Sequence, residues 1–125
     1  MAASRVATQA FTGSFVNGSA TVAAVKALAP AEFTVIAMGH EAHERCTEDD
    51  LCREWLIAAL IDRPLELGDL PARLQSAPAA AKFFDPLADW ALRQDCDLCT
   101  DVDSVGFAVC LAPSALGRPV LRRHA

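Results

Sequence analysis

The sequence predicts an α/β domain with three layers, α/β/α, around a mainly parallel or mixed sheet. The run FTVIAMG (residues 33–39) is apolar throughout, as expected of a strand that is buried on both faces. A helical pattern follows from Thr47, with three acidic residues in its first turn. Predicted strands and helices alternate in the order β-α-β-α-α-α-β, which is typical of a parallel sheet covered by helices.

Local signals justify each expected element. Pro30 and Pro64 end two of the helices, because proline cannot continue a helix. Thr47 and Asp50 have the spacing of a capping box at the start of the second of these helices. The expected elements are a strand at residues 6–15, a helix at 19–28, a strand at 33–39, a helix from 47 to the proline at 64, helical pieces at 70–75 and 79–84, a helix at 86–94, and a last strand in VGFAVCLAP at 105–113.

Length and composition exclude several classes of protein. A chain of 125 residues predicts a single domain, residues 1–125. Hydrophobic residues make up 53% and charged residues 22%, a balance that excludes a disordered chain. The net charge of −5 argues against a nucleic-acid partner, because binding a polyanion depends on clustered Lys and Arg. No apolar run approaches the roughly 18 residues of a membrane span, so we expect no membrane association.

The cysteines indicate the compartment. The chain has five of them, an odd number, and its first residues lack the apolar segment of a secretory signal. Reduced thiols therefore fit better than a disulfide framework, and we expect a cytoplasmic protein.

The turn after the first expected strand is a candidate anion site. Gly13 and Gly18 would let the backbone approach a ligand, and the start of the following helix offers free N–H groups. Ser14, Asn17 and Ser19 add side-chain donors. The segment is not a P-loop, because no Lys follows the second glycine. The alternative interpretation is a tight turn with an Asn or Ser cap.

A cluster of acidic residues follows the second expected strand and is a candidate Mg²⁺ site. It contains Glu41, Glu44, Glu48, Asp49 and Asp50. Mg²⁺ is usually held by one or two carboxylates together with substrate oxygens. Helix capping alone explains Glu48 and Asp50, and explains Asp49 less well. If the two strands are neighbours, anion donors would face cation ligands, as phosphoryl chemistry requires.

Two further motifs have metal or redox spacing. His40, His43 and Cys46 could take Zn²⁺, although structural zinc sites normally have four ligands. Cys96 and Cys99 have CxxC spacing, but the neighbouring aspartates would raise the thiol pKa values. For the CxxC motif the interpretation as ordinary thiols is preferred.

Several segments together resemble the 2-phosphosulfolactate phosphatases, a Mg²⁺-dependent family named for a step of coenzyme M biosynthesis. The resemblance lies in GSFVNGSATVAAV (residues 13–25), FTVIAMG (33–39), TEDDLCREWL (47–56) and DLCTDVDSVGF (97–107). Their order and spacing agree with the family over nearly the whole chain. Two positions depart from the family pattern: Ala37-Met38-Gly39 stands for Cys-Ala-Gly, and Arg53-Glu54 stands for Ala-Gly.

The resemblance implies an α/β enzyme of two similar halves, of which this chain matches the C-terminal half. It implies hydrolysis of the phosphate monoester of a small acidic hydroxy acid, phosphosulfolactate giving sulfolactate and phosphate. Glu48 and Asp49 would bind Mg²⁺, with Asp49 catalytic. Gly13, Ser14 and Asn17 would bind the phosphate or the acidic tail of the substrate.

Two alternatives stay open. One is a non-catalytic remnant of the family that keeps the fold without the first-half motifs. The other is a small zinc protein that uses His40, His43 and Cys46. Apolar surface that a missing half would cover also predicts self-association, so we expect a homo-oligomer.

Overall fold

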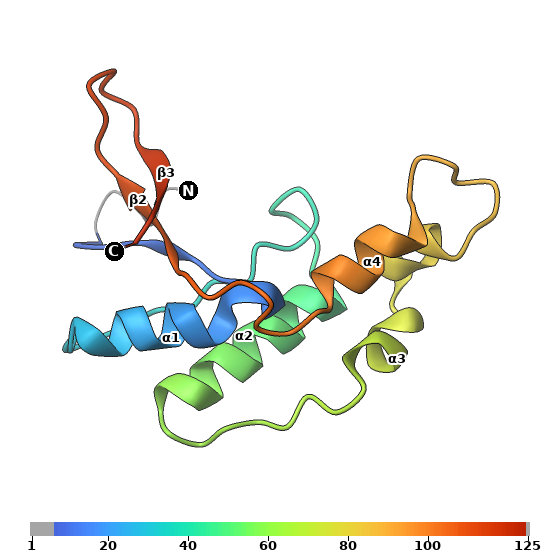
Figure 1. Ribbon diagram of the computed structural model, residues 1–125, viewed down its shortest axis with the longest axis horizontal. Helices are drawn as coiled ribbons and strands as arrows, with labels where there is room; N and C mark the ends of the chain where they lie inside the picture. Colours follow the sequence, from blue (N-terminus) through green and yellow to red (C-terminus); the bar gives the residue numbers. More distant parts are fainter. Residues whose placement is uncertain (1–6, 125) are drawn as a thin grey trace.

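The computed structural model describes residues 7–124 and shows helices and turns packed together, with a small sheet at one end (Figure 1). In chain order the elements are β1 (Phe11–Thr12), η2 (Phe15–Asn17), α1 (Gly18–Ala27), α2 (Thr47–Leu60), α3 (Leu70–Gln75), η3 (Pro78–Phe83), α4 (Arg93–Cys99), β2 (Val109–Ala112) and β3 (Val120–Arg123).

The sheet differs from the expected one, and the prediction of a three-layer α/β/α domain with a mainly parallel sheet is wrong. The three strands lie in the order β1-β2-β3 and both pairings are antiparallel. Cys110 of β2 pairs with Phe11 on one side and with Arg122 on the other. Figure 1 shows β2 and β3 as a hairpin that projects from the helices, so no helical layers sandwich the sheet.

The second strand of the predicted sheet, in chain order, is missing from this arrangement. Residues 33–39 belong to no strand, although their composition is typical of one. A strand needs a neighbour to accept and donate its backbone hydrogen bonds, and nothing described between residues 7 and 124 pairs with this run. The strand expected at 6–15 is reduced to β1, with residue 6 outside the described range.

The helix predictions were partly right. Helices expected from residue 19 and from Thr47 are confirmed as α1 and α2. The expected capping box on α2 is wrong, because Cys46 is the N-cap and no side chain caps the helix; Asp50 instead pairs with Arg45 at 2.9 Å. The helix expected at 86–94 is also wrong, since α4 begins only at Arg93 and continues through the first acids of the following segment to Cys99.

The core lies between α1, α2 and α3. α1 and α2 pack closely because Gly18 leaves room for the Trp55 ring, which stacks in a tilted arrangement on Phe15 at 5.9 Å between centroids. The buried cluster consists of Phe15, Leu51, Cys52, Leu56, Leu67, Leu70 and Leu74. Among residues 7–124, no helix combines the length and the apolar character needed to cross a membrane.

Candidate functional site

The predicted anion-binding turn forms a closed local network. The side-chain oxygen of Asn17 accepts hydrogen bonds from the Ser14 backbone N–H at 2.9 Å and from the Ser14 hydroxyl at 3.0 Å. Its amide nitrogen donates to the carbonyl of Thr12 at 3.3 Å. Asn17 is only 6% exposed. Ser14 and Asn17 therefore shape the turn that leads into α1, as the tight-turn interpretation predicts.

The start of α1 binds a carboxylate from the same chain. Asp103 accepts hydrogen bonds from the backbone N–H of Ser19 at 2.7 Å and from its hydroxyl at 2.5 Å. The backbone of this segment is docked as well, because Asp103 N–H donates to the carbonyl of Phe15 at 2.9 Å and Val105 N–H to that of Val16 at 2.8 Å. One of the N–H groups that the sequence assigned to an anion, that of Ser19, thus has an internal carboxylate as its partner.

Sequence reasoning missed the role of Asp103. The acidic run before the last strand was a visible signal, but its partner lies 84 positions earlier in the chain. Asp103 has a positive φ of 56°, a conformation that Asp adopts more readily than most residues. This backbone turn aims the carboxylate back at α1.

Asp49, the central residue of the predicted Mg²⁺ site, is positioned by the loop before α2. Its Oδ2 accepts a hydrogen bond from Gly39 N–H at 2.6 Å. Gly39 has φ +66°, and a Cβ there would overlap the carbonyl oxygen of Glu44, so only glycine fits. The loop closes through hydrogen bonds between the backbones of His40 and Glu44. Asp49 is therefore half-buried and held in place by one of its two carboxylate oxygens.

Glu48 has an unusual environment for a carboxylate on the first turn of a helix. Its Oε2 is buried and has no hydrogen-bond partner. Buried oxygens of this kind normally have a partner, and a water or a cation supplies it where protein does not. Asp50, by contrast, is paired with Arg45 and lies 3.8 Å from the guanidinium of Arg53. Arg53 Nε is also buried without a partner.

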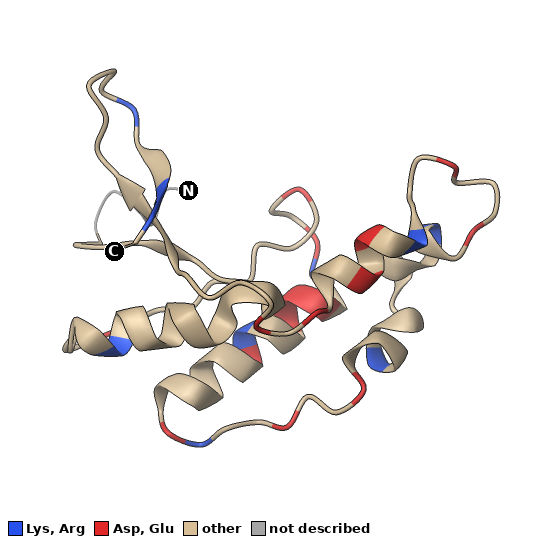
Figure 2. Ribbon diagram, viewed as in Figure 1, with Lys and Arg blue, Asp and Glu red and all other residues tan. Residues whose placement is uncertain are grey.

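Charge is unevenly distributed over the molecule. Figure 2 shows Asp and Glu over the first turns of α2 and along α4, whereas the charged residues of the β2–β3 hairpin are all arginines, Arg118, Arg122 and Arg123. Glu41 and Glu44, the other acids of the predicted cluster, are exposed. The described part of the chain contains no group of three or more His, Cys, Asp and Glu side chains arranged to hold a metal ion. Glu48 and Asp49 are thus at most a two-carboxylate donor set.

The two halves of the predicted site lie against different parts of α2. A Cβ at Gly13 would lie 3.0 Å from the Leu56 side chain, and Gly18 contacts Trp55. At 1.5 Å per residue, Asp49 is about 10 Å away from Leu56 along the helix axis. The structure therefore does not bring the turn before α1 and the acidic first turn of α2 together.

The surroundings of Cys46 and Cys96 favour the protonated thiol. Desolvation, followed by the charges of Glu48 and Asp49, raises the pKa of Cys46, so this residue is a poor metal ligand. Burial and then the charge of Asp97 raise the pKa of Cys96, as the sequence predicts. All five cysteines are free. Within residues 7–124, the side chains of His40, His43 and Cys46 do not form a group arranged to hold a metal ion.

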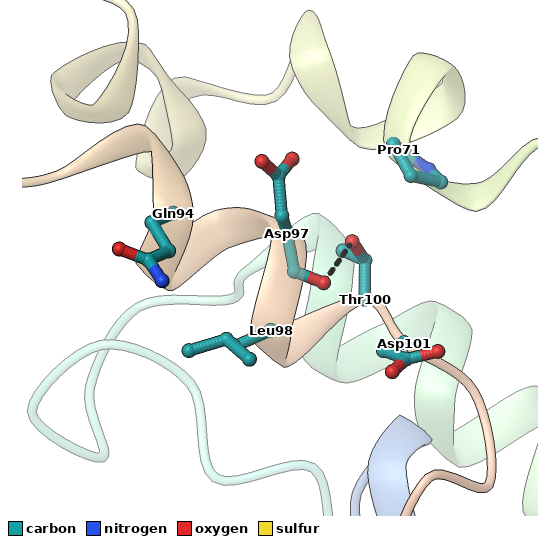
Figure 3. A pocket seen from close by; sticks show the side chains of 6 residues that line it. All are labelled: Pro71, Gln94, Asp97, Leu98, Thr100 and Asp101. Atoms are coloured by element: carbon teal, nitrogen blue, oxygen red, sulfur yellow. Dashed lines mark hydrogen bonds between the residues drawn. The ribbon is translucent and has the colours of Figure 1, made fainter.

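Two open hollows lie on the surface. Figure 3 shows the first, of about 380 Å³, where Thr100 donates to the carbonyl of Asp97 at 3.3 Å. Its lining is Pro71, Gln94, Asp97, Leu98, Thr100 and Asp101. Two acids and no Lys or Arg make it a poor site for an anion. The second hollow, of about 360 Å³, includes Arg45 and Arg73, which already bond to Asp50 and to the Leu67 carbonyl.

Comparison with known proteins adds no relative. No protein-family model matches the chain, and no curated protein or solved structure matches it significantly.

Proposed function

We propose that this chain is a Mg²⁺-dependent phosphatase module that acts on the phosphate monoester of a small acidic hydroxy acid. The observation that carries the proposal is the carboxylate pair Glu48–Asp49. Glu48 Oε2 is a buried acceptor that lacks a partner, and Asp49 is fixed through only one oxygen. The resemblance of residues 47–56 to the 2-phosphosulfolactate phosphatases supports the same pair.

Mg²⁺ is the ion that we propose for this carboxylate pair. This ion is usually held by one or two carboxylates and keeps several positions for water and phosphate oxygens. Glu48 and Asp49 would hold it, and a cation would satisfy the buried Glu48 oxygen. The chemistry that Mg²⁺ supplies in such sites is neutralisation of phosphate charge and a lowered pKa of bound water.

The chain's own residues would orient this pair. Gly39 N–H holds one oxygen of Asp49 at 2.6 Å and leaves the other free to face a ligand. The closed loop between His40 and Glu44 fixes Gly39 in turn. Gly13, Ser14 and Asn17 support the start of α1, and a contact of these residues with substrate stays a prediction.

The test is hydrolysis of a panel of substrates with and without Mg²⁺. The panel comprises p-nitrophenyl phosphate, phospholactate and phosphosulfolactate. We expect Mg²⁺-dependent phosphate release that is fastest with the acidic substrates and is abolished in Asp49→Asn, in which the amide oxygen can still accept from Gly39. Glu54→Gln is the matched control, because Glu54 is an exposed acid on the same helix. Full activity in Asp49→Asn would remove this residue from the site.

One observation favours a second candidate, a non-catalytic member of the same family. The start of α1 is occupied by Asp103, and the turn before it lies about 10 Å along α2 from Asp49. In a chain that does not catalyse a reaction, the start of α1 is free to bind Asp103 in place of a substrate phosphate. The absence of Mg²⁺-dependent hydrolysis across the whole panel would favour this candidate.

A further inference from the structure

Residues 34–38 have the side-chain pattern of a strand. Val35 and Ala37 are half-buried, whereas Thr34, Ile36 and Met38 are exposed; Phe33, just before them, is exposed as well. Val35 packs against the core cluster. Alternation with a period of two is the geometry of a strand with one face on a core.

Within residues 7–124, the backbone of this strand-like segment has no hydrogen-bond partner. In the part of the chain that the structure describes, no hydrogen bond joins residues 33–38 to any other residue. The next N–H along, that of Gly39, donates to Asp49. A row of free N–H and C=O groups in an extended apolar segment is a template for another strand, because only a strand satisfies such a row in register.

The sequence of the segment favours self-pairing. It reads FTVIAM and contains no charge, no proline and no glycine, so it lacks the residues that proteins use to block an exposed strand edge. Ile36 and Met38 leave 56% and 54% of their surface exposed. Two identical strands that run antiparallel about a two-fold axis present the same patch to each other, and no like charges meet.

We propose that residues 33–38 pair with the same residues of a second copy of this chain. The pairing would be antiparallel about a two-fold axis and would produce a homodimer. Ile36 and Met38 of both copies would lie on one face of the new strand pair. There they would contact side chains of the other copy, which removes part of their apolar surface from water. This inference does not depend on the proposed phosphatase activity.

Sedimentation velocity over a wide concentration range tests the proposal. We expect the wild-type chain to pass from monomer to dimer, and Ile36→Lys to weaken dimerisation by at least about tenfold, because two lysines would then face each other across the pair. Leu116→Lys is the control. Leu116 is 81% exposed in the turn between β2 and β3, so this variant should dimerise like the wild type. Circular dichroism confirms that each variant is folded.

Amide hydrogen exchange gives a second measurement that does not depend on a variant. We expect the amides of residues 34–38 to exchange more slowly at dimer concentrations than at monomer concentrations. The proposal is wrong if the wild-type chain is a monomer throughout, if Ile36→Lys dimerises as tightly as Leu116→Lys, or if these amides exchange equally fast in monomer and dimer.

Discussion

The carboxylate of Asp103 accepts two hydrogen bonds from Ser19, one from the backbone N–H and one from the hydroxyl, at 2.7 and 2.5 Å. This contact joins the segment after α4 to the first turn of α1. It gives that turn the negative charge that a helix N-terminus favours. The residue therefore acts as a helix cap supplied from the far end of the chain.

Asp103→Asn should lower the free energy of unfolding by about 0.3–1 kcal/mol, the range for a charge at a helix N-terminus, because the Asn side-chain oxygen can still accept a hydrogen bond from Ser19. Asn tolerates the positive φ of 56° at this position but carries no charge toward the helix. Urea denaturation measures the change. Asp101→Asn is the control, because Asp101 is exposed and its side chain makes no hydrogen bond among the described residues. Equal effects of the two substitutions would show that Asp103 does not cap α1.

Gly18→Ala should destabilise the contact between α1 and α2. A Cβ at this position would overlap the six-membered ring of Trp55, and overpacking of this kind costs about 1–3 kcal/mol. The same substitution in a Trp55→Leu background should cost much less, since the overlapping atoms are gone. Gly106→Ala, where a Cβ meets open space, is the control. If Gly18→Ala lowers the free energy of unfolding equally in the wild type and in Trp55→Leu, then Gly18 does not make room for the Trp55 ring.

Gly39→Ala and Gly117→Ala form a matched pair that tests the loop holding Asp49. Both glycines have positive φ, which costs an alanine about 1–2 kcal/mol. A Cβ at Gly117 meets nothing within 4 Å, whereas a Cβ at Gly39 overlaps the carbonyl oxygen of Glu44. Chemical denaturation should therefore show a larger loss for Gly39→Ala. Equal losses of stability would show that the loop can shift to accommodate a Cβ at residue 39 without a further loss in free energy.

Cys52 should make stability depend on pH in the alkaline range. Burial, followed by the charge of Asp49, raises its pKa from 9.0 to about 11. Between these values the unfolded chain has lost the thiol proton and the folded chain retains it, so stability falls as pH rises, by up to about 1.4 kcal/mol per pH unit. Below pH 9.0 the Cys52 thiol is protonated in both the folded and the unfolded chain, so its ionisation does not lower the stability there.

Urea denaturation at a series of pH values, for the wild type and for Cys52→Ala, isolates this effect. The chain has no tyrosine, which removes one other group that titrates in this range. The wild-type chain should lose more stability than Cys52→Ala between about pH 9 and 11. Parallel curves for the two proteins would show that Cys52 ionises as freely in the folded chain as in the unfolded one.

Elements with local signals could be predicted from the sequence. α2 was predicted because three acids stand in its first turn and Pro64 lies beyond its end. The helical piece at α3 was predicted within its bounds, Leu70–Gln75. α4 was missed because the expected helix ended at residue 94 and the acidic segment after it was assigned to no element, although an acid such as Asp95 in the first turn of a helix is favourable.

Features that depend on distant partners could not be predicted. The apolar run at 33–39 predicts a strand, but its composition does not say whether a neighbour is present. The pairing of β2 with β3 was missed although Ser114 and Gly117 mark a turn between them. In the site, the acidic residues of α2 were found from the sequence. The bond from Gly39 to Asp49 and the cap by Asp103 needed the structure.

The dependence of phosphate release on Mg²⁺ concentration tests the central claim most directly. It is measured for the wild type, for Glu48→Gln and for Glu54→Gln. If the buried oxygen of Glu48 holds the ion, the wild-type rate saturates with Mg²⁺, and Glu48→Gln needs at least about tenfold more of it. Glu54→Gln should match the wild type. The same Mg²⁺ dependence in all three proteins, or no Mg²⁺-dependent release from any of them, would contradict the account.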